Sequence, residues 1–492
     1  MLNHFPILTL MLIAPLLFGV VILCLPASAT KTPRWLALAG SGLLFILSVL
    51  VFLLFNRSAS GVQFVQSILW LPALGISFKV GVDGVSVLLL LLTGIVALAG
   101  VVVSWKIDDR PREFFTYLLF LAVSVAGVFM SLDAFQLFFF LEIAVFPKYL
   151  MIVMWGWKEK KEYGGMKLTL YLFFGSMLAL AGILALVNEA GLNSFDLISL
   201  QEVQFSVTFQ RIWFPFIFIG FAVLGGLFPF YNWAPDGHVA APTAVSMLLA
   251  GVEMKVGTFA ALRLGIMLLP DGAKFWAPLI IILAVINIVY GAFLALVQTD
   301  FKYIIGFSSV SHMGFVILGF ASLNNEGLLG AGMQMFSHGV MTALFFAIVG
   351  MVYDRTHTRD LSKLGGLAGK LPLATIGFII AGLVSMGMPG FSGFVSEFPI
   401  FMGIWQKAPA AAIVSVLGVV ITAAYILRTV TKVFFGNLNP ESAVAVTALP
   451  WRDKFIIVGL SLVLIIMGVL PSLFSGSVSQ GVNNILSLLG AG

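Results

Sequence analysis

The chain has 492 residues and a net charge of +5; 60% of its residues are hydrophobic and only 10% are charged, with a mean hydropathy of +1.10. This composition excludes an ordinary water-soluble protein, whose surface needs far more charge. The single cysteine, Cys24, excludes an internal disulfide, an iron–sulfur cluster or a cysteine-held zinc site, so any redox chemistry must occur on another polypeptide.

The first apolar stretch, near residues 5–25, is followed by Ala27-Ser28-Ala29, which resembles a signal-peptidase site. However, only His4 precedes the apolar run, so the basic region of a signal peptide is missing. The run also covers about twenty residues, which is enough to cross a bilayer. We therefore predict a retained first helix.

Fourteen apolar stretches in all have spanning length. Only helices and closed barrels satisfy their backbone polar groups inside lipid, and these stretches are uniformly apolar rather than alternating. We therefore predict an all-α integral membrane protein of about fourteen transmembrane helices. The stretches lie near 5–25, 35–55, 82–105, 114–131, 133–156, 166–187, 211–234, 240–269, 275–298, 302–322, 327–352, 371–404, 410–435 and 455–473.

The basic residues are spread over short loops rather than clustered in a patch, which argues against a nucleic-acid partner. Loops after odd-numbered stretches carry eighteen Lys and Arg, against five after even-numbered ones. The positive-inside rule then places the odd loops in the cytoplasm and both termini outside. Three basic residues are left inside helices, namely Lys148, Lys255 and Arg263.

Two of the stretches contain prolines that predict a broken helix. Residues 224–238 include Pro229 and Pro235, and residues 387–398 include Pro389. Proline removes an amide donor and clashes with the preceding turn, and open backbone at membrane depth is tolerated only beside protein or water. These are stretches seven and twelve, so corresponding breaks lie five helices apart, as in an inverted repeat.

Ionisable residues inside spanning stretches are costly, so they usually pair, face a cavity or move ions. Glu142 has long apolar runs on both sides. Burial favours its neutral form and a nearby cation its charged form, a balance that suits proton exchange. Lys255 and Glu253 lie two residues apart, about 200° around a helix, so they should face different neighbours. A structural pair is the alternative for both Glu142 and Glu253.

Two histidines and a further acid complete the set. His312 and His338 are expected in membrane helices, His312 beside several serines, where a hydrated proton relay is favoured over a purely structural role. Glu397 follows the break at Pro389, which suits the exit of a proton. Asp83 is expected to cap a helix start. Arg355, His357, Arg359 and Asp360 are expected to form a solvated or interface loop on the cytoplasmic side.

Six sequence strings occur together and in order between residues 80 and 435. With them the chain resembles the antiporter-like M-type subunits of NADH:quinone oxidoreductase (respiratory complex I), within a superfamily shared with Mrp-type cation/proton antiporter and membrane hydrogenase subunits. The strings are GVDGVSVLLLLLT, FFFLEIAVFP, NWAPDGHVAAPTAVSMLLAGVEMK, ALVQTDFKYIIGFSSVSHMGF, an HG pair with YDRTHTRD, and GMPGFSGFVSEF.

The resemblance implies fourteen helices, with helices 4–8 and 9–13 as inverted five-helix repeats and helices 7 and 12 broken. The corresponding division of the chain is 1–110 for the first three helices, 111–270 and 271–436 for the two repeats, and 437–492 for the last helix and tail. It also implies a proton path through a fifth-helix glutamate, an eighth-helix lysine, relay histidines and a twelfth-helix acid. These correspond here to Glu142, Lys255, His312, His338 and Glu397, with His238 as the histidine of the PDxH string.

One departure from the pattern concerns the helix-seven lysine that usually partners the fifth-helix glutamate. The matching position is Leu224. Either this subunit conducts poorly and serves mainly as a scaffold, or another cation stands in. Lys148 is the candidate, because it follows the kinking Pro147 on the same stretch as Glu142.

The function expected from residues and resemblance together is proton translocation from the cytoplasm to the outside, driven by redox chemistry in partner subunits. The proton would enter near Asp300 and Lys302, be held on Lys255 and leave by Glu397. No cofactor is expected on this chain; NADH, FMN, iron–sulfur clusters and quinone belong to partners. The alternatives are a Na⁺/H⁺ antiporter subunit of the Mrp type and a poorly conducting structural subunit of a membrane hydrogenase or oxidoreductase. The expected location is the cytoplasmic membrane.

Overall fold

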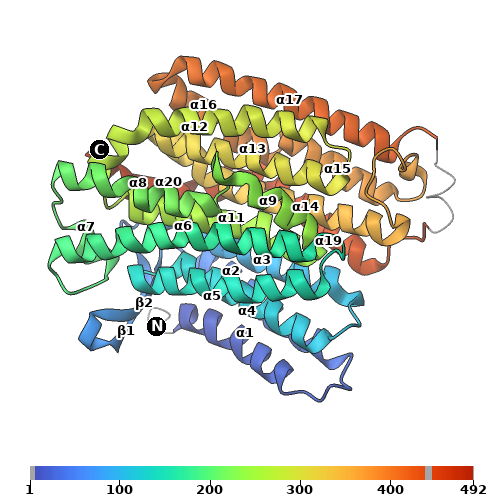
Figure 1. Ribbon diagram of the computed structural model, residues 1–492, viewed down its shortest axis with the longest axis horizontal. Coiled ribbons are helices and arrows are strands. Elements are labelled where there is room, and N and C mark those ends of the chain that lie inside the picture. The colour runs from blue at the N-terminus through green and yellow to red at the C-terminus, as the bar shows by residue number, and fades with distance from the viewer. Residues whose placement is uncertain (1–5, 438–445, 491–492) are drawn as a thin grey trace.

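The computed structural model describes residues 6–437 and 446–490. It is built almost wholly of helices that run roughly parallel to one another along the long axis of the molecule (Figure 1). Over these residues, eleven helices are long and apolar enough to cross a membrane, or twelve when the bent pair at the carboxyl end counts as one span. The all-α membrane class is therefore confirmed. The fourteen predicted spans also count two apolar helices that are too short for this criterion, Ile7–Leu23 and Pro372–Ser385.

The α-helices and the two strands have the following bounds. They are α1 (Ile7–Leu23), α2 (Thr32–Leu54), β1 (Gln63–Leu71), β2 (Ile76–Val82), α3 (Gly84–Val103), α4 (Pro111–Met130), α5 (Ala134–Trp155), α6 (Lys161–Ala190), α7 (Leu197–Gln201), α8 (Val207–Leu224), α9 (Trp233–Ala240), α10 (Thr243–Leu248), α11 (Met254–Ala260), α12 (Pro270–Val297), α13 (Phe301–Ser322), α14 (Asn325–Thr356), α15 (Pro372–Ser385), α16 (Ser392–Lys407), α17 (Pro409–Phe434), α19 (Trp451–Val469) and α20 (Ser472–Leu488).

Local sequence signals fix several helix starts. Proline stands at the first or second position of α2, α4, α12, α15 and α17, where its missing amide hydrogen costs nothing. Asp83 caps α3: its carboxylate accepts from the amides of Val85 and Ser86 at 3.1 and 2.9 Å, and the Ser86 hydroxyl accepts from the Asp83 amide. The role expected for Asp83 at a helix start is therefore confirmed.

A β-hairpin between α2 and α3 was not predicted from the sequence. Strands β1 and β2 pair antiparallel at the end of the molecule that also carries α7 (Figure 1). Gly75 in the turn has φ +67°, and a Cβ there would lie 1.8 Å from the carbonyl oxygen of Asn193, so this close approach requires glycine. The apolar residues of β1 are largely exposed, with Ile68 64% and Leu69 63% accessible, so the strand lacks the alternation of a half-buried strand.

Both expected helix breaks are present. The first opens the backbone between α8 and α9, and the second separates α15 from α16. Gly387 and Gly390 in the second break have φ +63° and +94°, and the backbone would be strained at these angles if either residue carried a side chain. The inverted-repeat relation between the two halves stays a prediction.

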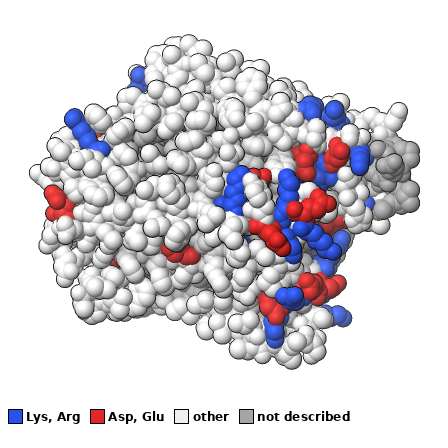
Figure 2. Space-filling view, in the orientation of Figure 1, with Lys and Arg blue, Asp and Glu red and all other residues white. Residues whose placement is uncertain are grey.

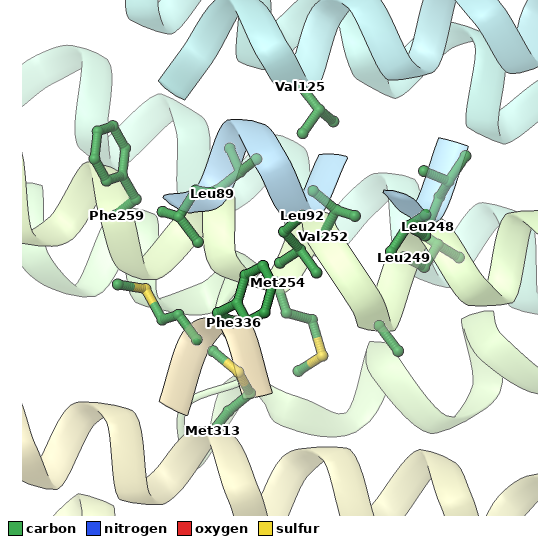
Figure 3. Close-up of a cluster of buried hydrophobic side chains, with 14 of the residues drawn as sticks. Leu89, Leu92, Val125, Leu248, Leu249, Val252, Met254, Phe259, Met313 and Phe336 are labelled. Atoms are coloured by element: carbon green, nitrogen blue, oxygen red, sulfur yellow. The ribbon is translucent and has the colours of Figure 1, made fainter. Parts of the chain in front are cut away.

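The interior of the bundle is formed by the span that contains α10 and α11, together with α13 and α14. All of the apolar window of the first is buried, and 94% of each of the other two. Peripheral helices such as α5 and α17 are only 39% and 33% buried. Figure 3 shows Leu248, Leu249, Val252, Met254 and Phe259 of the central span gathered around leucines of α3. This apolar packing encloses the central span, so charges on it are held far from bulk solvent.

Candidate functional site

Two short π-helical segments interrupt the central span. They cover Leu249–Glu253 (η5) and Ala261–Ile266 (η6), on either side of α11. A π-turn widens the helix by one residue and is frequent at functional sites. Glu253 ends the first segment and Lys255 follows in α11, both with no more than 1% of the residue accessible.

The carboxylate of Glu253 points toward α5, where it forms a buried ion pair with Lys148. The side chains of the pair are 2% and 1% exposed, so neither charge has solvent as an alternative partner. The second carboxylate oxygen of Glu253, Oε1, is buried without a hydrogen-bond partner among the described residues. The sequence suggested that Lys148 serves Glu142; the structure pairs it with Glu253 instead.

Glu142 lies six residues before Lys148 on the same helix and is half-buried. Its Oε1 atom is also buried and lacks a hydrogen-bond partner in the part of the chain described. The polar groups that act on its carboxyl group are Ser176 of α6 and Lys148. Its helix neighbours Ile143 and Phe146 are exposed on the outside of the bundle, so Glu142 sits close to the lateral surface.

Lys255 points to the opposite side of its helix, toward α14. Its Nζ atom lies 2.5 Å from Nδ1 of His338 and donates to the carbonyl oxygen of Ala250 at 2.5 Å. That carbonyl belongs to the π-helical segment, so the widened turn supplies an acceptor for the ammonium group. The expectation that Glu253 and Lys255 face different neighbours is confirmed.

The polar contacts continue from His338 to the second break. The rings of His338 and His312 have centroids 5.6 Å apart. His312 contacts Oε1 of Glu397 through Nδ1 at 3.1 Å and the Ser385 hydroxyl through Nε2 at 2.9 Å. The His312 ring is therefore held between a carboxylate and a hydroxyl, which suits a group that accepts a proton at one nitrogen and releases it at the other.

Glu397 closes this series at the break between α15 and α16. Gln334 of α14 donates to its Oε1 at 3.0 Å, and a Cβ built at Gly387 would lie 3.1 Å from its Oε2. Glu397 itself is 3% accessible, whereas Met388, within the break, is 45% accessible. The carboxylate thus lies at the inner edge of a segment that reaches the surface.

His238 lies in the last turn of α9. Its ring is fully buried between Trp233 and Phe346, and neither nitrogen has a hydrogen-bond partner within the described chain. The charged groups that act on it are Lys302 and Lys255. In a neutral imidazole one nitrogen is an N–H donor and the other an acceptor, so this ring is able to take up a proton at one nitrogen and release a proton from the other.

Lys302 connects this interior to a cleft of about 700 Å³ at one end of the bundle. It is 7% accessible, and its Nζ donates to the carbonyl oxygen of Ala241 at 2.6 Å. Asp300 caps α13 through the amides of Lys302 and Tyr303, and its other oxygen pairs with Arg359 at 3.3 Å. The cleft is lined by Lys302 and Arg359 together with acidic and aromatic side chains, among them Asp354, Asp453, Trp105 and Trp157.

The prediction of a solvated or interface loop for residues 355–360 is wrong for its two arginines. Arg355 lies in the last turn of α14, is 3% accessible and pairs with Asp453 at 2.9 Å. Arg359 is 8% accessible and stacks on the ring of Trp157 at 4.1 Å. The sequence could not show this, because both partners are distant in the chain. Another buried pair that sequence reasoning missed joins Arg263 to Asp83 at 2.8 Å.

Leu224, which stands where the resemblance implies a lysine, ends α8 and is 6% accessible. A Cβ added at Gly257 would lie 2.8 Å from the Cβ of Leu224, so α8 and α11 approach closely here. Leu224 therefore makes an apolar contact with α11 and places no charge beside it. Among the described residues, no cluster of three or more His, Cys, Asp or Glu side chains could hold a metal ion.

Comparison with known proteins gives a consistent result over most of the chain. The transmembrane family described as NADH:quinone oxidoreductase/Mrp antiporter matches residues 131–422, which include every candidate residue above from Glu142 to Glu397. The chain is 37% identical over 451 residues to the NAD(P)H-quinone oxidoreductase chain 4-2 of Synechocystis sp., covering 90% of this chain and 80% of that one. It is 34% identical over 472 residues to NADH-quinone oxidoreductase subunit M of Rhodobacter capsulatus, covering 93% and 91%.

Solved structures agree with these sequence matches. A chain of respiratory complex I from Thermus thermophilus, determined with bound NADH, superposes with a TM-score of 0.90 at 29% identity and covers 98% of this chain and 100% of that one. A chain of the Mrp complex from Dietzia sp. superposes with a TM-score of 0.85 at 20% identity, covering 98% and 99%, a likeness that concerns the fold alone. The membrane-subunit fold expected from the resemblance is thereby confirmed, while the count of fourteen helices and the two inverted repeats stay predictions.

Proposed function

Since this chain belongs to the NADH:quinone oxidoreductase/Mrp antiporter transmembrane family, we propose that it is the proton-translocating membrane subunit of an NADH:quinone oxidoreductase (complex I) type assembly. Its partners are the other membrane subunits of that assembly. The redox chemistry, with NADH, FMN, iron–sulfur clusters and quinone, takes place on partner chains. This chain contributes the path for protons.

A row of buried ionisable groups carries the proposal. It begins at Lys302 beside the cleft, continues through His238 to Lys255 and His338, and ends with His312 against Glu397. Each of these six residues is at most 7% accessible. A buried charge without compensation is costly, so a row of them across the bundle is maintained only if it serves a purpose such as proton transfer.

We infer the direction of transport from the placement of charge. Figure 2 shows Lys, Arg, Asp and Glu gathered toward one end of the visible face, the end at which α15 and α19 lie in Figure 1. The cleft with Lys106, Lys158, Arg359 and Arg452 belongs to loops with an excess of basic residues, so we assign it to the cytoplasm. The first and last described residues lie toward the opposite end, which we assign to the outside. The membrane would be the cytoplasmic membrane.

In this scheme a proton enters the cleft, reaches Lys255 by way of Lys302 and His238, and passes to His338 and His312. Glu397 releases it at the break between α15 and α16. The proposed repeats, 111–270 and 271–436, divide the candidate residues between them. Glu142 lies away from the row, near the lateral surface, where a neighbouring subunit could act on its charge.

The test is the replacement of Lys255 by alanine in the assembled complex within membrane vesicles. We expect the number of protons moved per electron to fall, while electron transfer to an artificial acceptor is unchanged, because the proposal places the redox groups on partner chains. Lys274→Ala is the matched control, since the Lys274 side chain is 52% exposed and its ion pair among the described residues is with Asp271. A wild-type proton-to-electron ratio in Lys255→Ala would disprove the scheme and favour a scaffold. Transport of Na⁺ without a redox substrate would favour the Mrp type.

A further inference from the structure

A narrow apolar groove of about 330 Å³ runs along α19 on the lateral side of the bundle. Residues of α2, α3, α14 and α20 complete its walls, and every residue that lines it is apolar. Leu50 of α2 and Val458 and Leu462 of α19, which neighbour the groove on these helices, are exposed and apolar. The groove therefore borders a surface that suits lipid, and it shares no lining residue with the charged cleft beside Lys302.

Gly459 leaves space in this groove that the described chain does not fill. A Cβ at this position would have no atom of another described segment within 4 Å, although Ile456 and Leu460 beside it on α19 are buried. Protein interiors are packed as densely as organic crystals, and a void lined only by apolar groups is unfavourable for water. The suitable occupant is therefore an apolar molecule.

The length of the groove agrees with one leaflet of a bilayer. On α19 the lining runs from Phe455 to Ile466, which is roughly 16 Å along the helix axis at ~1.5 Å per residue. The hydrocarbon core of a bilayer is ~30 Å thick, so the acyl chains of one leaflet extend over about 15 Å. A helix of a partner protein, ~10 Å across and equally long, would need on the order of 1,200 Å³, several times the volume of the groove. A single acyl chain fits, and a helix does not.

Three tryptophans surround one arginine where the groove begins. Arg452 precedes Gly459 by about two turns of α19, so the two residues share one face of the helix. The guanidinium carbon of Arg452 lies 4.5 Å from the ring centre of Trp105 and 5.4 Å from that of Trp451. Trp105 in turn packs edge-on against Trp35, with ring centres 5.0 Å apart. Tryptophan is enriched where membrane meets water, so this group marks the level of the lipid headgroups.

The charge of Arg452 is available to an anion. Stacking on a ring leaves the N–H edges of a guanidinium open, and arginine binds phosphate oxygens with two of its N–H groups. The adjacent acid, Asp453, pairs with Arg355 at 2.9 Å, and no carboxylate of the described residues forms an ion pair with Arg452. Lys454 is exposed and adds a second positive charge at the same level. This end of the groove therefore attracts an anionic headgroup.

We propose that the groove binds one anionic phospholipid, with its phosphate on Arg452 and one acyl chain along α19 past Gly459. The lipid belongs to the leaflet at the charged end of the bundle (Figure 2). Its chain ends beside Phe336 of α14 and Phe474 of α20. Because Phe336 and His338 are two residues apart, they face different sides of α14. The acyl chain thus closes the lipid side of the helix that holds His338, whichever ion the protein transports.

A second arginine lies near the other end of the groove and serves as a control. The guanidinium carbon of Arg57 lies 5.6 Å from the ring centre of Phe52, a lining residue. Arg57 follows the end of α2, and in the described chain it stacks on this one ring, whereas Arg452 lies against two. Gly42 is the control for Gly459, because nothing lies within 4 Å of a Cβ there and it does not line the groove.

The test uses the assembled complex in vesicles that contain phosphatidylglycerol with a photoactivatable group at the end of one acyl chain. After transfer into detergent and removal of loosely held lipid, irradiation attaches the retained lipid to the protein, and mass spectrometry identifies the labelled peptides. In the wild type we expect label on the segments around Phe336 and Phe474. Gly459→Leu should reduce this label about fivefold, because the leucine side chain takes the space of the lipid. Gly42→Leu should leave the label unchanged.

The arginine variants test the headgroup. Arg452→Gln should reduce the label about threefold, because the phosphate loses its charged partner, whereas Arg57→Gln should retain it. Equal label in Gly459→Leu and Gly42→Leu would overturn the site, and so would a wild type without label around Phe336 and Phe474. Loss of label in Arg57→Gln instead of Arg452→Gln would overturn the proposed placement, since the headgroup would then lie in the opposite leaflet.

Discussion

Nζ of Lys255 and Nδ1 of His338 lie 2.5 Å apart, and this contact joins the two halves of the polar row. Lys255 belongs to α11 and His338 to α14, so 83 residues of chain separate the partners. Two groups that both act as donors when protonated cannot share such a contact, so at least one of them gives up a proton. The pair is therefore built to hold one proton rather than two.

Replacing His338 by leucine tests this contact. The variant keeps the volume of the interior but leaves Lys255 without its acceptor on α14, so protons should no longer pass from α11 to His312. We expect the proton-to-electron ratio in vesicles to match that of Lys255→Ala. His357→Leu is the control, because His357 is exposed and lies outside the polar row. Unimpaired transport in His338→Leu would place the path elsewhere.

The buried pair of Asp83 and Arg263 gives a prediction on stability. One oxygen of Asp83 caps α3 and the other contacts Arg263 at 2.8 Å. Asp83→Asn keeps an acceptor for the cap but leaves the arginine unpaired, which should cost about 3–5 kcal/mol. Asp83→Ala also removes the cap and should cost about 1 kcal/mol more. The check is thermal unfolding in detergent. The double variant Asp83→Asn with Arg263→Met should regain the melting temperature that Asp83→Asn alone loses. Equal melting temperatures of Asp83→Asn and wild type would contradict the argument.

Much of the fold was predictable from the sequence, because spanning length, apolar composition and proline breaks are local properties. The breaks near Pro229 and Pro389 were predicted for this reason, and so were the opposite directions of Glu253 and Lys255 on one helix. The π-turns were not predicted, since no sequence signal in the central span marks their extra residue.

The partners of buried charges were the part that sequence could not supply. Lys148 pairs with a residue 105 positions away, and the arginines of the 353–367 segment reach Asp300 and Asp453. Such contacts depend on which helices lie side by side, which hydrophobic patterns do not specify when helices are apolar all round. The β-hairpin was missed for another reason, because its first strand, β1, exposes apolar residues instead of alternating them.

Gly257 marks a close approach of α8 to α11 beside the central lysine. A Cβ at this position would lie 2.6 Å from both the Gly225 amide nitrogen and the Phe221 carbonyl oxygen, which are backbone atoms and cannot turn aside. We expect Gly257→Ala to force the helices apart and destabilise the protein by about 1–3 kcal/mol. Gly42→Ala is the control, since nothing lies within 4 Å of a Cβ there. A lower melting temperature in detergent should appear in Gly257→Ala alone; an equal effect of both variants would refute the packing argument.

Lys302 is the group at which protons should leave the cleft for the interior. It lines the cleft, is 7% accessible, and its ammonium group is held by the Ala241 carbonyl directly ahead of His238 on the path. Lys302→Met keeps most of the side-chain volume but removes the only titratable atom of that residue, so proton uptake from the cytoplasmic side should slow. The deficit should grow as pH rises, because a scarcer proton makes uptake the limiting step. Lys363→Met is the control, since Lys363 is exposed and does not line the cleft. The measurement is the initial rate of redox-driven proton uptake by inverted vesicles between neutral and alkaline pH, and equal rates for both variants at every pH would mean that protons enter without Lys302.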